Sequence, residues 1–163
     1  MQAGFDTLPP YSPLLFALFF VAAWTLTCFL ISIVSGWFSL SQRFTMQAEP
    51  VGDTKSAGPF FYSVYMRFLC HYSSVIRVTV AADALYLSVL FPFRIGHPPL
   101  RIPWEEIEME RSTFLWMKYI VLTLGREERI RLSIPARMAS HLGILGGIPK
   151  GAGSLAISGG VRE

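Results

Sequence analysis

Charged residues are missing from the start of this sequence: residues 7–42 contain no Asp, Glu, Lys or Arg. Within that stretch, residues 13–34 form an unbroken apolar run, PLLFALFFVAAWTLTCFLISIV. About 20 helical residues cross the hydrocarbon core of a bilayer, so this run predicts one transmembrane helix. The alternative is a buried core helix, but such helices rarely reach this length without a polar stripe.

A cleavable signal peptide is a second alternative for the same run. Signal peptides begin with positive charge, whereas the residues before this run include Asp6 and no Lys or Arg. Their apolar core is about 7–15 residues long and leads to a small-residue cleavage site, and neither condition is met here. We therefore expect a retained anchor, with Tyr11, Trp24 and Trp37 as aromatic residues of the membrane interface.

The basic residues predict the orientation of this anchor. All 14 Lys and Arg residues follow the apolar run. Because positively charged flanks stay on the cytoplasmic side, residues 1–12 are expected to be a short extracytoplasmic N-terminus and residues 13–36 the transmembrane helix. The C-terminal part is then cytoplasmic, anchored in the inner (cytoplasmic) membrane of the cell. Only 15% of the residues are charged, below the roughly 25% of soluble domains, as expected for a membrane protein.

Cysteine and the common catalytic motifs are scarce as well. Cys28 lies inside the apolar run and Cys70 far beyond it, which argues against a disulfide framework. The histidines at 71, 97 and 141 stand apart from one another and do not have metal-ligand spacing. No phosphate-binding loop, dinucleotide fingerprint or nucleophile elbow occurs. The sequence predicts no enzyme, no metal and no cofactor, and it is compatible with a pigment or a lipid in contact with the anchor.

Four carboxylates cluster in the second half of the chain: Glu105, Glu106, Glu108 and Glu110. Paired carboxylates can perform acid–base chemistry or bind a cation. On a strand, however, the last three lie on the face opposite Ile107 and Met109, which is the expected solvated face. A structural role is therefore favoured. Nucleic-acid binding is not expected either, because the arginines alternate with glutamates and form no basic stripe.

After residue 60 the apolar residues recur with the period of half-buried strands. This period predicts two antiparallel hairpins, formed by residues 75–80 with 85–90 and by residues 117–124 with 129–134. Residues 60–69 are expected to supply a strand or a short helix before the first hairpin.

The end of this region predicts a short closing helix that begins at Pro135 and ends at Gly143. Residues 60–143 are thus expected to contain five or six antiparallel strands followed by one helix. The fold class is a small α+β, mainly antiparallel domain behind an N-terminal helix. A curled sheet or small barrel with a C-terminal helix buries such strands economically.

The phase of the apolar residues changes within the segment LRIPWEEIEMER. Ile102 and Trp104 share one phase, whereas Ile107 and Met109 share the other. This slip predicts a bulge or a corner at which the strand bends between two sheets. Pro103 is tolerated at such a corner.

Two segments flank the predicted domain. Residues 37–59 are rich in Pro, Gly and polar residues and predict a juxtamembrane linker with one helical turn near residues 40–44. A clip laid against a partner is the alternative for this segment. Residues 144–163 are Gly-rich and nearly uncharged, which predicts a flexible tail.

The stretch YLSVLFPFRIGHPPLRIPWEEI, with the predicted hairpins and closing helix around it, resembles small bacterial pleckstrin-homology-like (PH-like) domains. More closely, it resembles a group of uncharacterised bacterial single-pass membrane proteins with a cytoplasmic PH-like domain. The resemblance covers residues 60–142 and the anchor. It implies a PH-like fold and a binding role, with no catalytic residue and no lipid-binding signature to carry over.

One proline-rich loop, FPFRIGHPPLR, combines aromatic and basic residues and is the candidate docking loop. Its candidate contact residues are Phe91, Phe93, Arg94, Ile95, His97, Leu100 and Arg101. Such a combination suits an anionic membrane surface or a protein interface. In the alternative, the phenylalanines close the end of the barrel. His97 is also expected to order the loop through a hydrogen bond.

The sequence therefore predicts a non-enzymatic, membrane-anchored interaction protein. Its expected role is that of an accessory, stabilising subunit of a larger integral-membrane complex, bioenergetic or photosynthetic. The alternative is a stand-alone sensor or adaptor that binds anionic lipids through the basic loop. Expected partners are other integral-membrane subunits and membrane lipids, and neither nucleic acid nor a small-molecule substrate is expected.

Overall fold

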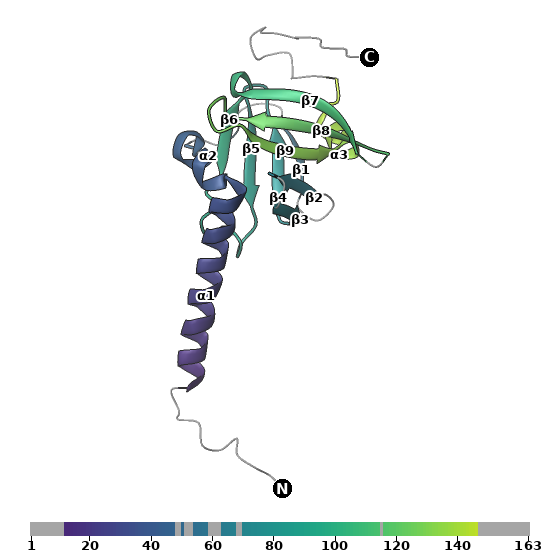
Figure 1. Cartoon of the computed structure of the whole chain (residues 1–163). Coiled ribbons are helices and arrows are strands. Elements are labelled where there is room, and N and C mark those ends of the chain that lie inside the picture. The colour runs from purple at the N-terminus through teal and green to yellow at the C-terminus, as the bar shows by residue number, and fades with distance from the viewer. Residues whose placement is uncertain are drawn as a thin grey trace.

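The apolar helix projects from a separate β domain in this computed structural model (Figure 1). The structure describes residues 12–47, 50, 54–58, 63–67, 70–114 and 116–146. The predicted N-terminal segment with Tyr11, and the Gly-rich tail from residue 147 onward, lie outside the described residues. Helix α1 (Ser12–Ser35) matches the predicted helix to within one residue at each end, and it is long and apolar enough to cross a membrane.

Within the described residues, the β domain consists of two antiparallel sheets. Its strands are β1 (Lys55–Ala57), β2 (Ser63–Met66), β3 (Cys70–Ser73), β4 (Ile76–Val80), β5 (Ala84–Val89), β6 (Leu100–Pro103), β7 (Ile107–Phe114), β8 (Met117–Leu124) and β9 (Ile130–Pro135). The first sheet has the order β1-β4-β5-β6 and the second the order β3-β2-β9-β8-β7. The remaining elements are α2 (Trp37–Phe44), the 3-10 turn η1 (Trp104–Glu106) and α3 (Ala136–Leu142). A mainly antiparallel domain with a C-terminal helix was the predicted class, and the structure divides its strands between two sheets.

The core lies between the two sheets because each strand turns every second side chain inward. Val78 of β4 and Leu87 of β5 come from the first sheet, and Leu122 of β8 and Leu132 of β9 from the second; all four are almost fully buried. Helix α3 adds Met138 and its neighbours to the same core. Burial of such side chains stabilises the fold by about 1.5–3 kcal/mol each.

Both predicted hairpins are present. Strands β4 and β5 pair with Val80 opposite Leu85, and β8 and β9 pair with Leu124 opposite Ile130. The strand count was underestimated for two reasons. The region before the first hairpin contributes β2 and leads into β3, a hairpin of its own with Ser63 opposite Ser73. The segment predicted as one bent strand forms both β6 and β7.

The predicted corner between two sheets is confirmed, although a 3-10 turn forms it and not a bulge. η1 leads the chain from β6 in the first sheet to β7 in the second. Trp104 at its start is 2% exposed, and its indole N–H donates to the Ala81 carbonyl at 2.9 Å. This buried hydrogen bond holds the corner against the end of β4.

The segment predicted as a linker, residues 37–59, instead supplies parts of the domain. Trp37, Leu40 and Phe44 of α2 are buried, because their spacing of three and four places them on one helix face. Farther along, Ala57 of β1 pairs with Val78. The domain therefore begins at α2, directly after α1.

Gly36 joins α1 to α2 without a flexible linker. Its φ of +83° lies in the left-handed region that favours glycine, and a Cβ there would overlap Ile130 Cδ1 of β9. Beside it, the Arg67 guanidinium donates to the Val34 carbonyl at 3.3 Å, which satisfies an end group of α1. The helix and the domain are thus packed directly against each other.

A substitution of Gly36 tests this junction. Gly36→Ala should lower the free energy of unfolding by at least about 1–2 kcal/mol, because left-handed backbone costs an L-residue that much. Overlap with Ile130 should add to the loss. Ile130→Val removes the overlapping methyl group and so permits a double-mutant cycle. The losses in free energy of unfolding of the two single variants should sum to more than the loss in the double variant.

Denaturant unfolding of the detergent-solubilised chain measures these differences. Gly58→Ala is the matched control, because no atom lies within 4 Å of an added Cβ there and its φ is not positive. A Gly36→Ala variant as stable as this control would contradict the described junction.

Candidate docking site beside the apolar helix

The β5–β6 loop (residues 90–99) runs back along the C-terminal half of α1. The rings of Phe93 in the loop and Trp24 in α1 lie 5.2 Å apart between centroids. Trp24 in turn stacks on Phe20, one helical turn earlier, at 6.2 Å. The loop therefore reaches about 16 Å along α1 from its end at Ser35, at 1.5 Å per residue.

Close approach of the loop to the helix depends on small residues. A Cβ at Gly96, whose φ is +73°, would lie 3.3 Å from the Phe29 backbone. On the helix side, the buried residues of α1 are Cys28, Ser32 and Ser35, which share one face through spacings of four and three. The Ser32 hydroxyl donates to the Gly96 carbonyl. Small residues at a contact let two backbones approach closely, as in helix pairs within membranes.

Two turns shape the loop itself. The Phe93 N–H donates to the Leu90 carbonyl and the His97 N–H to the Arg94 carbonyl, both at 2.9 Å. The Phe91–Pro92 peptide bond is cis. These turns direct the side chains of Phe91, Arg94 and their neighbours outward.

His97 holds the base of the loop, as predicted. Its Nδ1 lies 3.0 Å from the Ile95 carbonyl and its Nε2 lies 2.9 Å from the Tyr72 hydroxyl. A carbonyl only accepts, so we assign the proton to Nδ1, and Nε2 then accepts from Tyr72. Burial lowers the pKa of His97, which keeps the ring neutral, and burial raises the pKa of Tyr72 to about 12.

The candidate contact residues divide into two groups. Phe91 is 86% exposed, and Phe93, Arg94 and Ile95 are also exposed on the outside of the loop. His97 and Leu100, in contrast, are buried at 2% and 0%. The exposed part of the predicted docking loop is therefore residues 91–95.

Two predicted contact residues, Leu100 and His97, are buried, whereas Arg101 is partly exposed and paired within the chain. Leu100 begins β6, and its place opposite Leu87 turns it into the core. Both ring nitrogens of His97 are engaged in the hydrogen bonds that hold the base of the loop. Arg101 lies on the outward face of β6, where it pairs with Asp83 at 2.9 Å. That pair is exposed, and exposed pairs contribute about 1 kcal/mol or less.

The aromatic residues predicted for the membrane interface also differ from one another in burial. Trp37 is fully buried, and its indole N–H donates to the Pro98 carbonyl at 2.9 Å. It therefore anchors the β5–β6 loop and cannot lie among lipid headgroups. Trp24 is half-buried beneath Phe93.

The residues that hold the loop in place, above all Ser32 and Tyr72, were not predicted from the sequence. For Ser32 a signal exists: Cys28, Ser32 and Ser35 are small residues at spacings of four and three inside an apolar run. Such a face predicts close packing of the helix against another backbone. Tyr72 carried no comparable signal, because its pairing with His97 depends on the tertiary fold.

The glutamate cluster has structural partners. Glu106 accepts from the Arg126 backbone N–H at 3.0 Å, and Glu110 lies 3.7 Å from Arg131 on the same outward sheet face. Within the part of the chain that the structure describes, no group of three or more His, Cys, Asp or Glu residues could hold a metal ion.

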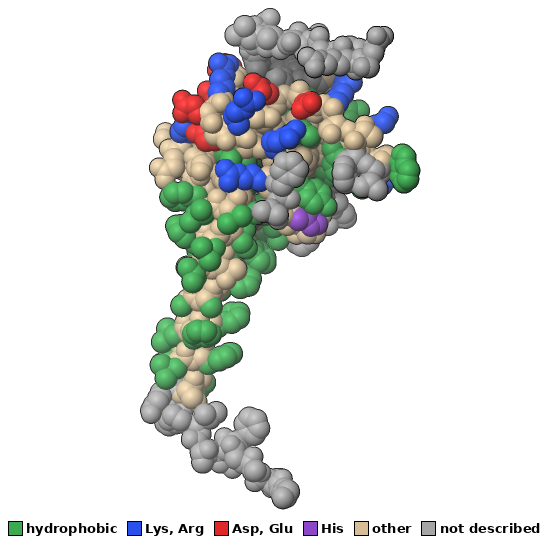
Figure 2. Space-filling model, in the orientation of Figure 1, with side chains coloured by type: hydrophobic (Ala, Val, Ile, Leu, Met, Phe, Trp, Pro, Cys, Tyr) green, Lys and Arg blue, Asp and Glu red, His purple; other side chains and the backbone are tan. Residues whose placement is uncertain are grey.

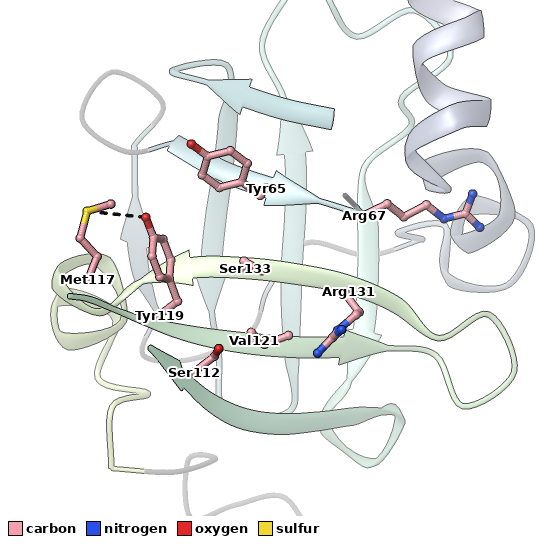
Figure 3. A pocket seen from close by; sticks show the side chains of 8 residues that line it. All are labelled: Tyr65, Arg67, Ser112, Met117, Tyr119, Val121, Arg131 and Ser133. Carbon is pink, nitrogen blue, oxygen red and sulfur yellow. Dashed lines mark hydrogen bonds between the residues drawn. The ribbon is translucent and has the colours of Figure 1, made fainter. Parts of the chain in front are cut away.

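A groove of about 450 Å³ crosses the outward face of the second sheet (Figure 3). It is lined by Tyr65, Arg67, Ser112, Met117, Tyr119, Val121, Arg131 and Ser133. Figure 3 shows the Arg67 and Arg131 side chains extending in different directions, so they do not converge on one anion. Arg67 caps α1 and Arg131 faces Glu110. The groove thus lacks a focused polar centre.

Polar and apolar side chains are segregated over the molecule. Figure 2 shows hydrophobic side chains along the length of α1 and charged side chains over the β domain. On α1, Phe19 is 71% and Leu26 59% exposed. The loop residues 91–95 extend this apolar surface and add one cation, Arg94, which makes them the candidate docking site.

The buried, neutral His97 predicts a pH-dependent stability. Its pKa lies below the ordinary value of 6.5 in the folded chain, so the unfolded chain binds more protons near pH 6. The free energy of unfolding should therefore fall as pH decreases from about 7 to about 5. His97→Gln should flatten this slope, whereas the exposed His71→Gln control should keep it. Denaturant unfolding in detergent across this pH range measures both, and equal slopes for His97→Gln and the native chain would contradict the assignment.

Comparisons with known proteins identify no relative for this arrangement. No protein-family model matches the chain, and no match was found among curated proteins or among solved structures.

Proposed function

We propose that this protein is a non-enzymatic, membrane-anchored accessory subunit of a larger integral-membrane complex. In this proposal α1 crosses the membrane and the β domain lies at its cytoplasmic surface. The 24 residues of α1 extend about 36 Å, compared with about 30 Å of hydrocarbon. Every Lys and Arg follows α1, which supports a cytoplasmic domain in the inner (cytoplasmic) membrane.

We also propose that the β domain is PH-like, as in the bacterial single-pass proteins that its sequence resembles. Two antiparallel sheets that enclose one core, with the closing helix α3 beside β1, β8 and β9, support this proposal. Such a domain is a scaffold whose loops bind, and it needs no catalytic group.

The observation that carries the proposal is the position of the β5–β6 loop beside α1. If α1 crosses the bilayer, Phe93 lies beside Trp24 at membrane depth, about 16 Å below the end of the helix. Non-helical backbone is tolerated there only where protein or a water-filled cavity covers it. An integral-membrane partner that covers the loop would meet this requirement.

The rigid junction at Gly36 supports a stabilising role. Because α1 packs directly on the domain, a partner that contacts the helix within the membrane also holds the domain at the membrane surface. One chain can then clamp both regions of a larger complex. A bioenergetic or photosynthetic complex is the class that we propose.

A second candidate function is a stand-alone sensor that binds anionic lipids. The exposed Arg94 between exposed Phe93 and Ile95 favours it, because apolar residues with a cation suit an anionic membrane surface. The two functions differ in whether the purified protein carries protein partners.

Purification of the tagged full chain from its own membranes in a mild detergent tests the proposal. We expect integral-membrane proteins to co-purify in fixed stoichiometry, identified by mass spectrometry and by the size of the native complex. A chain that purifies alone would reject the subunit function. Vesicle binding of that chain, with Arg94→Glu as the variant and Arg77→Glu as a control on the outward face of β4, would then test the lipid-binding function.

A further inference from the structure

We propose that the β5–β6 loop receives a transmembrane helix of the partner protein, and that Arg94 pairs with a carboxylate on that helix. The inference rests on the proposed function and assigns the surface and the chemistry of the contact. In the groove on the second sheet, Arg67 is engaged by the Val34 carbonyl and Arg131 by Glu110, and in the glutamate cluster Glu106 is engaged by the Arg126 backbone.

The apolar part of this surface is shared by the loop and α1. Phe20, Trp24 and Phe93 form a row of rings with centroid separations of 6.2 and 5.2 Å. Phe91 and Ile95, on either side of Phe93 in the loop sequence, are 86% and 38% exposed. Exposed aromatic residues that are held by buried neighbours are the usual anchors of a protein interface.

Backbone carbonyl groups of the loop accept hydrogen bonds on the side that faces α1 and the domain. Toward α1 and the domain, three carbonyl groups have donors: that of Ile95 accepts from His97 Nδ1, that of Gly96 from the Ser32 hydroxyl and that of Pro98 from the Trp37 indole. Among the described residues, none accepts a hydrogen bond from the Phe91 N–H. A peptide group at membrane depth costs several kcal/mol in lipid unless protein or water satisfies it.

Arg94 provides the charge that the partner must match. Some arginines of the domain have anionic partners within the chain, such as Arg43 with Glu127 and Arg101 with Asp83, whereas other described arginines such as Arg77 do not; Arg94 differs from Arg77 because it lies in the loop beside α1. Among the described residues, no acidic side chain forms an ion pair with Arg94. A cation at membrane depth pairs with an anion or faces a watery cavity, so the anion must come from another molecule.

Depth favours a protein carboxylate over a lipid phosphate as that anion. The loop around Arg94 packs on Phe29 through Gly96 and on Trp24 through Phe93, which are residues within the apolar span of α1. Phosphates lie outside the hydrocarbon core of about 30 Å, whereas a helix can present a carboxylate at any depth. An acidic residue facing Arg94 also satisfies the general requirement that intramembrane charges be paired.

Site-specific photo-crosslinking in native membranes tests the surface. A photoreactive residue in place of Phe91 should form an adduct with an integral-membrane protein, and peptide mapping should place the adduct on one of its helices. Matched positions are Leu26, an exposed residue on the opposite face of α1, and Trp116, which is 94% exposed at the β7–β8 turn. Both should give fewer adducts with that helix.

Charge reversal tests the pairing. Arg94→Glu should reduce recovery of the partner by about tenfold or more, because reversal leaves two like charges facing each other. Arg94→Lys should retain most of it, and Arg77→Glu should have no effect. Replacement of the mapped acidic residue by Lys should restore recovery with Arg94→Glu.

The outcomes separate the inference from the function on which it rests. Lipid adducts at Phe91, or adducts with a second copy of this chain, would overturn the inference, as would unchanged recovery with Arg94→Glu. If one of these results came with adducts between Leu26 or Trp116 and an integral-membrane protein, the inference would be wrong but the proposed subunit function would still be supported. Absence of protein adducts at all three positions, together with purification of the chain alone, would reject the function as well.

Discussion

The close junction at Gly36 is the constraint on which the rest of the structure depends. α1 enters the domain directly because one residue with positive φ turns the chain, and because the missing Cβ leaves room for Ile130. Arg67, which directly follows β2, donates to the Val34 carbonyl at the end of α1. With the helix held in this way, its small-residue face meets the β5–β6 loop. A flexible linker in place of Gly36 would leave neither the direction of α1 nor the position of the loop determined.

Several polar groups near this junction hold the loop. Ser32, Trp37 and His97 donate to three of its carbonyl groups, and Tyr72 donates to His97 in turn. Buried polar networks of this kind rigidify a structure when every member has a partner. The side of the loop that faces away from α1 carries Phe91 and its exposed neighbours instead. This asymmetry separates the part of the loop that maintains the fold from the part that is free to bind.

Periodicity predicted much of the fold, and tertiary pairing explains what it missed. The two hairpins, the corner at Trp104 and the closing helix follow from alternation, a phase slip and a proline–glycine pair. α2 was assigned to a linker because its polar composition concealed the buried face of Trp37, Leu40 and Phe44. The candidate contact loop was identified by composition, but composition does not reveal where β6 begins. Leu100 was therefore grouped with exposed residues, although the pairing of β6 with β5 turns it inward.

Rigidity of the loop bears on the choice between a lipid and a protein as its ligand. Lipid chains are fluid and adapt to any apolar surface, so a lipid-binding loop gains little from being held at one depth and orientation. A helix is a rigid ligand, and its binding benefits when the receiving surface is ordered in advance, because less conformational entropy is lost on association. The hydrogen bonds to the loop from α1, α2 and its own histidine provide that order. The structure therefore has the properties that recognition of a helix requires and that contact with lipid does not.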